Sequence, residues 1–159
     1  MILHGLPPVI DERARVLILG SFPSTASLAA GQYYAHPQNQ FWRILGAVIE
    51  RPLHEMDYAA RIAAVQAAGI AIWDVYASCE RDGSLDAAIR NAVPNDFSRH
   101  QKSALALRRI CFNGRMAARR LREIAGMGFE TRVLPSTSPA HAGMRFEEKL
   151  VAWRAALVE

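Results

Sequence analysis

The chain has 159 residues, of which 51% are hydrophobic, and its formal net charge is +4. A chain of this size and composition can bury a sizeable core, so we expect one domain spanning residues 1–159 that needs no stapling by disulfides or metals. No apolar run approaches the roughly 18 residues of a membrane span and the N-terminus lacks a basic-then-apolar signal pattern, so we expect a soluble protein.

Four short apolar runs, at residues 15–19, 71–76, 110–113 and 131–134, predict strands. They are apolar on both alternating faces, which is typical of a parallel sheet covered on both sides. Helical patterns lie at 41–49, 58–68, 114–124 and 146–157. The alternation predicts an α/β fold, a three-layer α/β/α sandwich around a mainly parallel sheet of about four strands.

The carboxyl ends of these strands are the expected place for a ligand, because open parallel sheets bind ligands where the strand order reverses. The segments leaving the four strands are 20–24, 77–79, 113–115 and 135–139. Three of the four are rich in Gly, Pro, Ser, Asn or aromatic residues, a composition expected of a binding rim.

The two cysteines and the arginines bear on cofactors and partners. Cys79 and Cys111 lie in apolar runs without metal-ligand spacing, so we expect no cofactor, metal, iron–sulfur cluster or disulfide framework, and a cytoplasmic location. Arginines gather between residues 108 and 122. Their guanidinium groups suit contacts with a nucleic-acid backbone, although composition alone favours exposed faces of surface helices.

The segment 18–42 carries the most specific pattern of the chain. A predicted strand is followed there by Gly20-Ser21-Phe22-Pro23, then by Ser27, Gly31 and the run from Tyr34 to Trp42. This arrangement resembles motif 1 of the uracil-DNA glycosylase superfamily, in the form seen in the mismatch-specific branch: a strand, a Gly-x-x-Pro turn, and an aromatic-Ala-x-Pro-x-Asn-x-Phe-Trp stretch. Ser138-Pro139-Ala140, in the segment 135–143, resembles motif 2. The resemblance covers essentially the whole chain.

Departures from the family pattern point to one branch. Ser21 and Phe22 stand where relatives carry a catalytic Asn or a nearby Asp, and the turn resembles that of hypoxanthine-DNA glycosylases. The resemblance implies that Asn39 takes over the catalytic duty. An amide is too weakly basic to deprotonate water, so Asn39 would position the attacking water by hydrogen bonding. Neither motif contains a lysine, which favours hydrolysis over a Schiff-base lyase step.

Recognition of the base is assigned on the same resemblance. The target nucleotide must leave the duplex and enter a pocket, where Phe22 is the expected stacking face. Relatives carry a base-reading amide at Asn113, whose carbonyl would accept N1–H of hypoxanthine while its amino group donates to O6. Uracil presents the same pair of groups, so we expect the depth of the pocket to separate the two bases. Three further base-binding residues are predicted: Ser21, Gln32 and Tyr34.

Contacts to the DNA phosphates and groove are expected from small hydroxyl residues and backbone N–H groups. The predicted contacts are Ser24, Ser136, Ser138, Pro139, Ala140, His141 and Arg115.

The sequence therefore predicts a monomeric, monofunctional glycosylase that removes deaminated bases, most of all hypoxanthine, from DNA and is nucleoid-associated if bacterial. A uracil or G:U/G:T mismatch glycosylase is the alternative. More distant alternatives are a serine hydrolase, with Ser21 as nucleophile, His36 or His141 as base and Asp74 as orienting acid, and a non-catalytic nucleic-acid binding module. The turn after Ser21 lacks the Gly-x-Ser-x-Gly pattern of a nucleophile elbow.

Overall fold

The computed structural model describes residues 1–141 and 143–158. Its central sheet contains four parallel strands in the order β3-β2-β6-β7. They are β2 (Val16–Gly20), β3 (Ile70–Asp74), β6 (Arg109–Asn113) and β7 (Glu130–Leu134). All four lie where the apolar runs predict them, and each strand begins within one residue of its run. The register places Gly20 opposite Asp74 and Asn113 opposite Leu134, so the strands end at one level.

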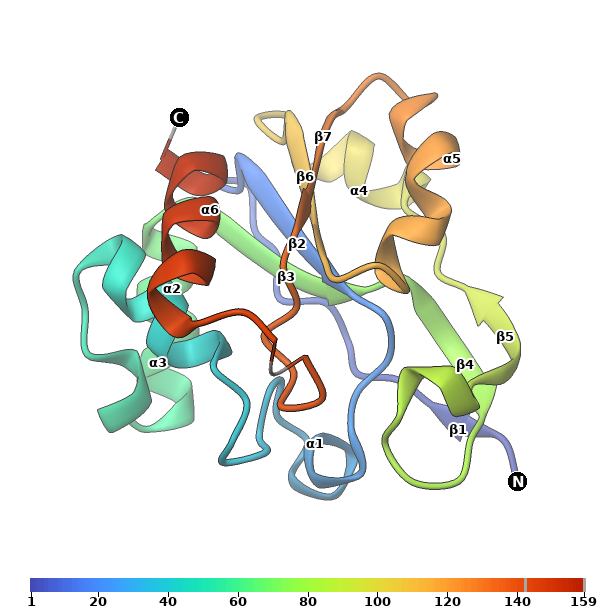
Figure 1. Cartoon of the computed structure of the whole chain (residues 1–159). Helices are drawn as coiled ribbons and strands as arrows, with labels where there is room; N and C mark the ends of the chain where they lie inside the picture. Colours follow the sequence, from blue (N-terminus) through green and yellow to red (C-terminus); the bar gives the residue numbers. More distant parts are fainter. Residues whose placement is uncertain (142, 159) are drawn as a thin grey trace.

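Helices cover both faces of this sheet, as the sandwich prediction requires (Figure 1). One face carries α2 (Phe41–Ile49), α3 (Tyr58–Ala67) and α6 (Phe146–Val158), and the other carries α4 (Ser98–Ser103) and α5 (Leu121–Ala125). Helix α1 (Thr25–Ala30) lies beyond the ends of the central strands. The sequence patterns predicted α2, α3 and α6 closely. The single helix expected over 114–124 is instead a 3-10 turn, η3 (Ala117–Arg120), that leads into α5.

A second, antiparallel sheet was not predicted. It contains β1 (Leu3–His4), β4 (Tyr76–Glu80) and β5 (Arg90–Pro94) in the order β1-β4-β5. The run predicted as one strand over 71–76 ends at Asp74, and after Val75 the chain enters β4 of this other sheet. The 3-10 turns η1 (Leu53–Glu55) and η2 (Asp86–Ala88) complete the elements.

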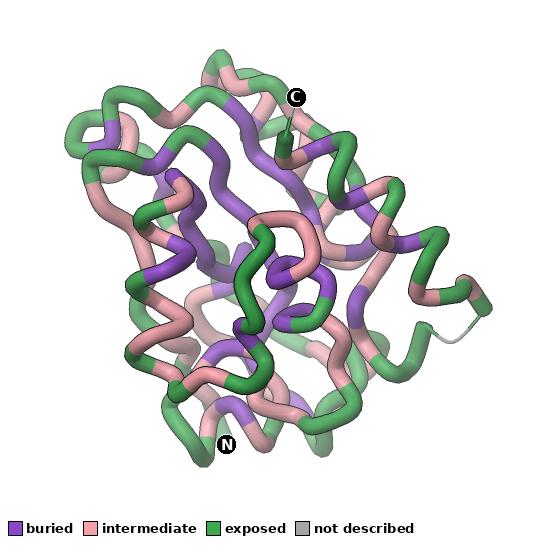
Figure 2. The backbone as a smooth tube through the Cα atoms, turned by 90° about the vertical axis from the view of Figure 1, so that its left-hand side faces the viewer, coloured by how far each residue is buried: buried purple, intermediate pink, exposed green. Residues whose placement is uncertain are grey.

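The core follows from the apolar strands. β2 and β3 are buried at all of their positions because helices pack on both faces of the sheet. Figure 2 shows these buried stretches running through the middle of the molecule, with exposed residues on the outer turns. On α2, the apolar side chains recur at helical spacing and bury Phe41, Trp42, Ile44 and Leu45.

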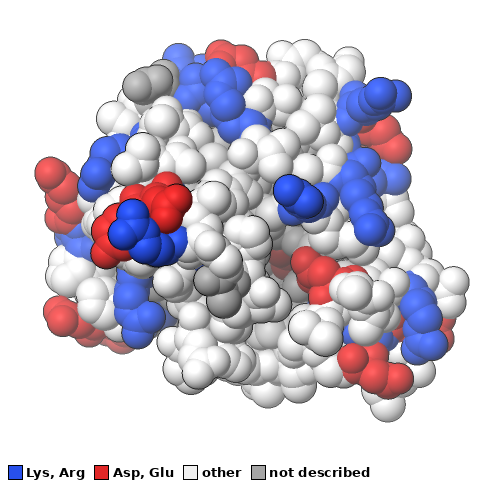
Figure 3. Space-filling view, in the orientation of Figure 1, with Lys and Arg blue, Asp and Glu red and all other residues white. Residues whose placement is uncertain are grey.

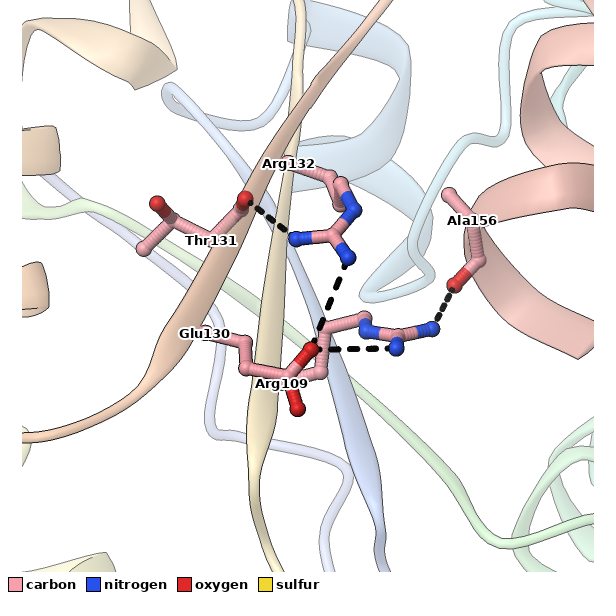
Figure 4. A network of polar contacts seen from close by, with 5 residues as sticks. All are labelled: Arg109, Glu130, Thr131, Arg132 and Ala156. Atoms are coloured by element: carbon pink, nitrogen blue, oxygen red, sulfur yellow. Dashed lines mark hydrogen bonds and ion pairs between the residues drawn. The ribbon is translucent and has the colours of Figure 1, made fainter. Parts of the chain in front are cut away.

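One buried charge joins the amino end of the sheet to α6 (Figure 4). Arg109, at the start of β6, is 6% exposed and donates to the Ala156 carbonyl at 2.7 Å and to Glu130 at 3.1 Å. Arg132 lies 3.5 Å from the same carboxylate oxygen. These contacts hold β6, β7 and α6 together at the end of the sheet remote from the strand ends described next.

Candidate functional site

A cavity of about 240 Å³ lies at the carboxyl ends of the four parallel strands. One water molecule needs roughly 10–15 Å³ measured in the same way, so the cavity has room for a ligand of many atoms. It is lined by the ends of three strands, at Gly20, Asp74 and Asn113, and by Ser136 beyond β7. The cavity therefore lies at three of the four strand exits named in the sequence analysis. The fourth exit, residues 77–79, does not line it, because these residues belong to β4 of the second sheet.

Most of the predicted site residues meet in this cavity. Its lining includes Ser21, Phe22, Ser24, Tyr34, Asn39, Asn113, Ser136, Ser138, Ala140 and His141. Three of the predicted residues do not line it: Gln32, Pro139 and Arg115. Gln32 follows the end of α1, where its backbone N–H bonds the Ser27 carbonyl, while Pro139 and Arg115 are exposed. Position 142, within the predicted motif 2 segment, lies outside the described residues.

Phe22 forms an aromatic wall and is only 6% exposed. The guanidinium carbon of Arg81 lies 5.3 Å from the centre of its ring. Arg81 also donates to the Pro23 carbonyl at 2.6 Å and to the Gly83 carbonyl at 2.8 Å. The turn that follows β2 is thus tied to the loop after β4, which holds the Phe22 ring in place.

Asn39 stands immediately before α2 and is held by the start of that helix. Its Oδ1 accepts the backbone N–H of Phe41 at 3.0 Å, and its own N–H donates to the His36 carbonyl at 3.0 Å. Oδ1 keeps a second lone pair, and within residues 1–141 and 143–158 no partner bonds Nδ2. The amide is therefore fixed in direction and still has one acceptor site and both amide hydrogens for a ligand.

Asn113 is more fully engaged. Its Oδ1 accepts the Thr137 backbone N–H at 3.0 Å, which fixes the orientation of the amide because a backbone N–H cannot accept. Its Nδ2 donates to Thr137 Oγ1 at 3.0 Å and to the Tyr34 hydroxyl at 3.2 Å. Both amide hydrogens thus have partners, and the second lone pair of Oδ1 is the group left for a ligand. The predicted donation from Asn113 to O6 would require one of these bonds to break.

Tyr34 adopts an uncommon backbone conformation, with φ of 53°. Such a conformation costs a bulky residue on the order of 1–3 kcal/mol, which surrounding contacts must offset. The ring stacks on Phe41 with the centroids 3.8 Å apart, and the hydroxyl accepts from Asn113. A Cβ placed on Gly20 would lie 2.9 Å from that hydroxyl, so glycine at the end of β2 makes room for it.

Two carboxyl groups line the cavity that were not among the predicted base or DNA contacts. Asp74 ends β3 and is 4% exposed, and Asp86 opens η2 and accepts the Ser21 hydroxyl at 2.7 Å. Figure 3 shows acidic atoms inside the hollow on this face, with basic side chains above it. Burial, and then the charge of Asp86, raise the pKa of Asp74 to about 7. A carboxylate inside the apolar run 71–76 was a usable signal for Asp74 in the sequence, whereas no sequence pattern indicated Asp86.

Lys149 of α6 joins the two motif segments although it does not line the cavity. It is 2% exposed, and its Nζ donates to Gln40 Oε1 at 3.0 Å and to the His141 carbonyl at 2.9 Å. The Gln40 backbone N–H bonds the Thr137 carbonyl at 3.0 Å. The residue next to Asn39 is therefore bonded to the segment after β7 through both its backbone and its side chain.

The serine hydrolase alternative finds little support in this geometry. The Ser21 hydroxyl donates to a carboxylate, and among the described residues no histidine bonds it.

In the part of the chain that the structure describes, no helix has the length and apolar character for crossing a membrane. In the same residues, no three His, Cys, Asp or Glu side chains cluster as metal ligands would.

The chain is similar to known proteins in both sequence and structure. Residues 7–158 match the family model described as the uracil DNA glycosylase superfamily. The chain is 43% identical over 141 residues to a protein named hypoxanthine DNA glycosylase from Methanosarcina acetivorans, covering 89% of each chain. A protein of the same name from Methanosarcina barkeri is 39% identical over 138 residues, or 87% of each chain. A solution NMR structure from M. acetivorans, solved as a candidate uracil DNA glycosylase, superposes with a TM-score of 0.90 at 40% identity, covering 99% of this chain and 97% of that one.

Proposed function

The chain belongs to the uracil DNA glycosylase superfamily, and we propose that it removes hypoxanthine from DNA by hydrolysing the N-glycosidic bond. The product is an abasic site. Two relatives named for this activity, each about 40% identical over most of the chain, support the choice of base. The observation that carries the proposal is the cavity at the strand ends, which gathers Phe22, Asn39 and Asn113 around one space.

The target nucleotide enters this cavity after rotating out of the duplex. Phe22, held by Arg81, offers its ring to the face of the flipped base. Stacking of a base on an aromatic side chain contributes about 1–3 kcal/mol and does not depend on which base is present. Phe22 therefore binds the base without selecting it.

Selection comes from the polar groups around Asn113. The free lone pair of its Oδ1 accepts N1–H of hypoxanthine, whereas adenine would direct a lone pair at the same oxygen. The Tyr34 hydroxyl, which accepts from Asn113, still has its own hydrogen and donates it to O6. Asn113 and Tyr34 therefore each make one of the two contacts to the base. Asn113 does not make both, because both hydrogens of its amide already have partners.

Asn39 orients the attacking water. Departure of the base leaves positive charge on the sugar, so the reaction needs a water molecule held beneath C1′ more than it needs a strong base. The bond from the Phe41 N–H fixes the direction of Asn39 Oδ1, whose second lone pair accepts a hydrogen of that water. Lys149 is bonded to two carbonyl groups and does not line the cavity, in agreement with a reaction without a Schiff base.

The rim of the cavity contacts the DNA backbone. Ser136, Ser138, Ala140 and His141 line it and present hydroxyl and backbone N–H groups suited to phosphate. Arg115 is exposed just beyond β6 and adds a phosphate contact outside the cavity. We further propose that the protein acts as a cytoplasmic monomer of one domain, without a metal or an iron–sulfur cluster.

The experiment is alkali-induced cleavage of labelled oligonucleotides that each contain one deoxyinosine, deoxyuridine, deoxyxanthosine or mismatched thymidine. We expect release of hypoxanthine, with strand breaks that appear only after alkali, and no covalent adduct on treatment with borohydride. Activity on none of these substrates would refute a glycosylase. Activity on uracil alone would refute the hypoxanthine assignment and leave the family membership intact.

A further inference from the structure

Asp74 carries a buried polar atom for which the described part of the fold supplies no partner. Its carboxyl is buried at the end of β3, lines the cavity, and among the described residues its Oδ2 has no hydrogen-bond partner. Its Oδ1 lies 2.6 Å from the position of a Cβ on Gly20, which shows how closely the carboxyl approaches the end of β2. An ionised carboxylate is costly in such a place unless it is paired.

The charged and titratable neighbours of Asp74 decide which of the two cavity carboxyl groups, Asp74 or Asp86, stays protonated near neutral pH. Burial raises the pKa of Asp86 above its usual range, while the hydrogen bond from the Ser21 hydroxyl and the charges of Arg81 and Arg119 favour its ionised form. Arg81 also favours ionisation of Asp74, but burial and the charge of Asp86 oppose this more strongly and raise the pKa of Asp74 to about 7. Asp86 therefore ionises first, and near neutral pH Asp74 still holds a proton for much of the time.

Such a proton would ease the departure of the base. When the bond between C1′ and N9 breaks, its electron pair stays with the purine, which departs as an anion unless a donor supplies a proton. The amides of Asn39 and Asn113 cannot supply it, and burial raises the pKa of both Tyr33 and Tyr34 well above the usual range of a tyrosine. Asp74 is the buried acid of the cavity that can transfer a proton near neutral pH.

We propose that Asp74 is the general acid of this site, and that its protonated carboxyl delivers a proton to a ring nitrogen of the departing purine. The inference rests on the proposed removal of hypoxanthine. The bond from C1′ to N9 breaks, its electron pair remains on the base, and the base leaves as neutral hypoxanthine with the proton from Asp74. The water held by Asn39 adds its oxygen to C1′ and releases a proton to solvent, and the Asp74 carboxylate regains a proton from solvent. Asp86 acts as a positioning residue whose negative charge keeps the proton on Asp74.

The test is the single-turnover rate of hypoxanthine release from a deoxyinosine oligonucleotide, measured from pH 5 to pH 9. For the unmodified protein we expect the rate to fall as the pH rises through about 7, because Asp74 loses its proton. Asp74→Asn keeps the shape of the side chain and removes the acid. It should slow release at pH 6 by about 10²-fold or more and abolish the fall at higher pH.

Two further variants separate the proposal from a purely structural role. Asp86→Asn removes the like charge, so the fall in rate should move to lower pH without disappearing. Asp82→Asn removes an exposed carboxylate and should leave both rate and profile unchanged. A decrease in rate with rising pH that persists in Asp74→Asn and vanishes in His36→Gln or His141→Gln would be assigned to a histidine that lines the cavity. That result would overturn the proposal.

A measurement on the unmodified protein tests the proposal even if a variant does not fold. Carboxyl ¹³C NMR should show one aspartate that titrates near pH 7, and its signal should be missing from Asp74→Asn. An Asp74 carboxyl that titrates near pH 4 would overturn the inference. If the unmodified protein releases no hypoxanthine at any pH, the proposed function fails; if it does so and Asp74→Asn has the same rate and profile, the inference on Asp74 alone fails.

Discussion

The ammonium group of Lys149 lies 3.0 Å from Oε1 of Gln40, so the C-terminal helix is bonded directly to the residue beside Asn39. The same group donates to the His141 carbonyl, which places one buried cation between the two motif segments. Burial lowers the pKa of this lysine, which shows that its charge is retained at a cost. We interpret it as the residue that sets the spacing of the two segments.

Replacing Lys149 by Met should therefore harm catalysis more than DNA binding. Both carbonyl groups would be left without the buried donor, at a cost of about 1–3 kcal/mol each. We expect kcat on a deoxyinosine oligonucleotide to fall by about tenfold or more, with a smaller change in KM. Arg154→Met removes an exposed cation from the same helix and should change neither constant. Equal effects of the two variants would contradict a role for Lys149 in spacing.

Asn39 has two duties that can be separated. Its Oδ1 accepts the Phe41 N–H in a local turn before α2 and, as proposed, orients water. A serine hydroxyl can accept the same N–H, although more weakly, but it lacks the amide. Asn39→Ser should therefore unfold at nearly the same denaturant concentration as the unmodified protein, while hypoxanthine release slows on the order of 10²-fold. Asn39→Ala should lose activity and about 1 kcal/mol of stability together. An active Asn39→Ser would show that Asn39 serves only the local turn.

Phe22→Leu tests the stacking wall. The substitution keeps an apolar side chain but removes the aromatic face, so binding of a deoxyinosine oligonucleotide should weaken by about tenfold or more. Fluorescence anisotropy against the matching undamaged duplex measures this change. Phe129→Leu, at a half-buried position that does not line the cavity, serves as the control. If both variants bind the damaged strand equally well, Phe22 is a core residue alone.

Gly20 is expected to tolerate no side chain. A Cβ at this position would lie 2.6 Å from Asp74 Oδ1 and 2.9 Å from the Tyr34 hydroxyl. Gly20→Ala should therefore displace both groups, reduce the rate of release by about 10²-fold and destabilise the fold by roughly 1–3 kcal/mol. Denaturant unfolding and single-turnover kinetics test the two effects separately. Normal kinetics in Gly20→Ala would show that neither group must keep its place.

Stability should also depend on pH through Asp74. Its pKa is raised from 3.8 to about 7 in the folded protein, so the folded state binds more protons than the unfolded state between these values. Its contribution to stability is fully present below pH 3.8 and is lost as the pH rises through 7. Asp74→Asn should consequently gain stability over the unmodified protein at pH 8, and much less at pH 5. Urea unfolding at the two pH values tests this, and an equal effect at both would contradict the raised pKa.

Much of the site was predictable because its residues follow apolar strands. The run that becomes β2 is buried on both faces, and the turn after it had to reach the edge of a parallel sheet. The second sheet was not predictable in the same way. β5 is largely exposed and pairs with β4 across a long loop, so neither its apolar content nor its spacing marks it as a strand. Asp86 reaches the cavity on that loop.

The hydrogen-bond partners of individual side chains could not be predicted from the sequence either. Lys149 sits among Glu148 and Leu150 in a pattern that reads as the solvated face of a helix, yet it is buried. Asn113 was predicted to meet the base with both ends of its amide, but Thr137 and Tyr34 occupy its hydrogens. Such contacts depend on how segments far apart in sequence approach, which local pattern does not encode.

From the position of α6 we expect the site to be completed late in synthesis. Besides the bonds of Lys149, Trp153 of this helix donates its indole N–H to the Pro135 carbonyl at 2.9 Å, at the exit of β7. The segment from 135 to 141 is thus held in place by residues of α6, which are synthesised after it. A nascent chain that already contains Asn39, Asp74 and Asn113 would lack an ordered rim until α6 has left the ribosome and docked. Base excision would then begin only after the rest of the fold is in place.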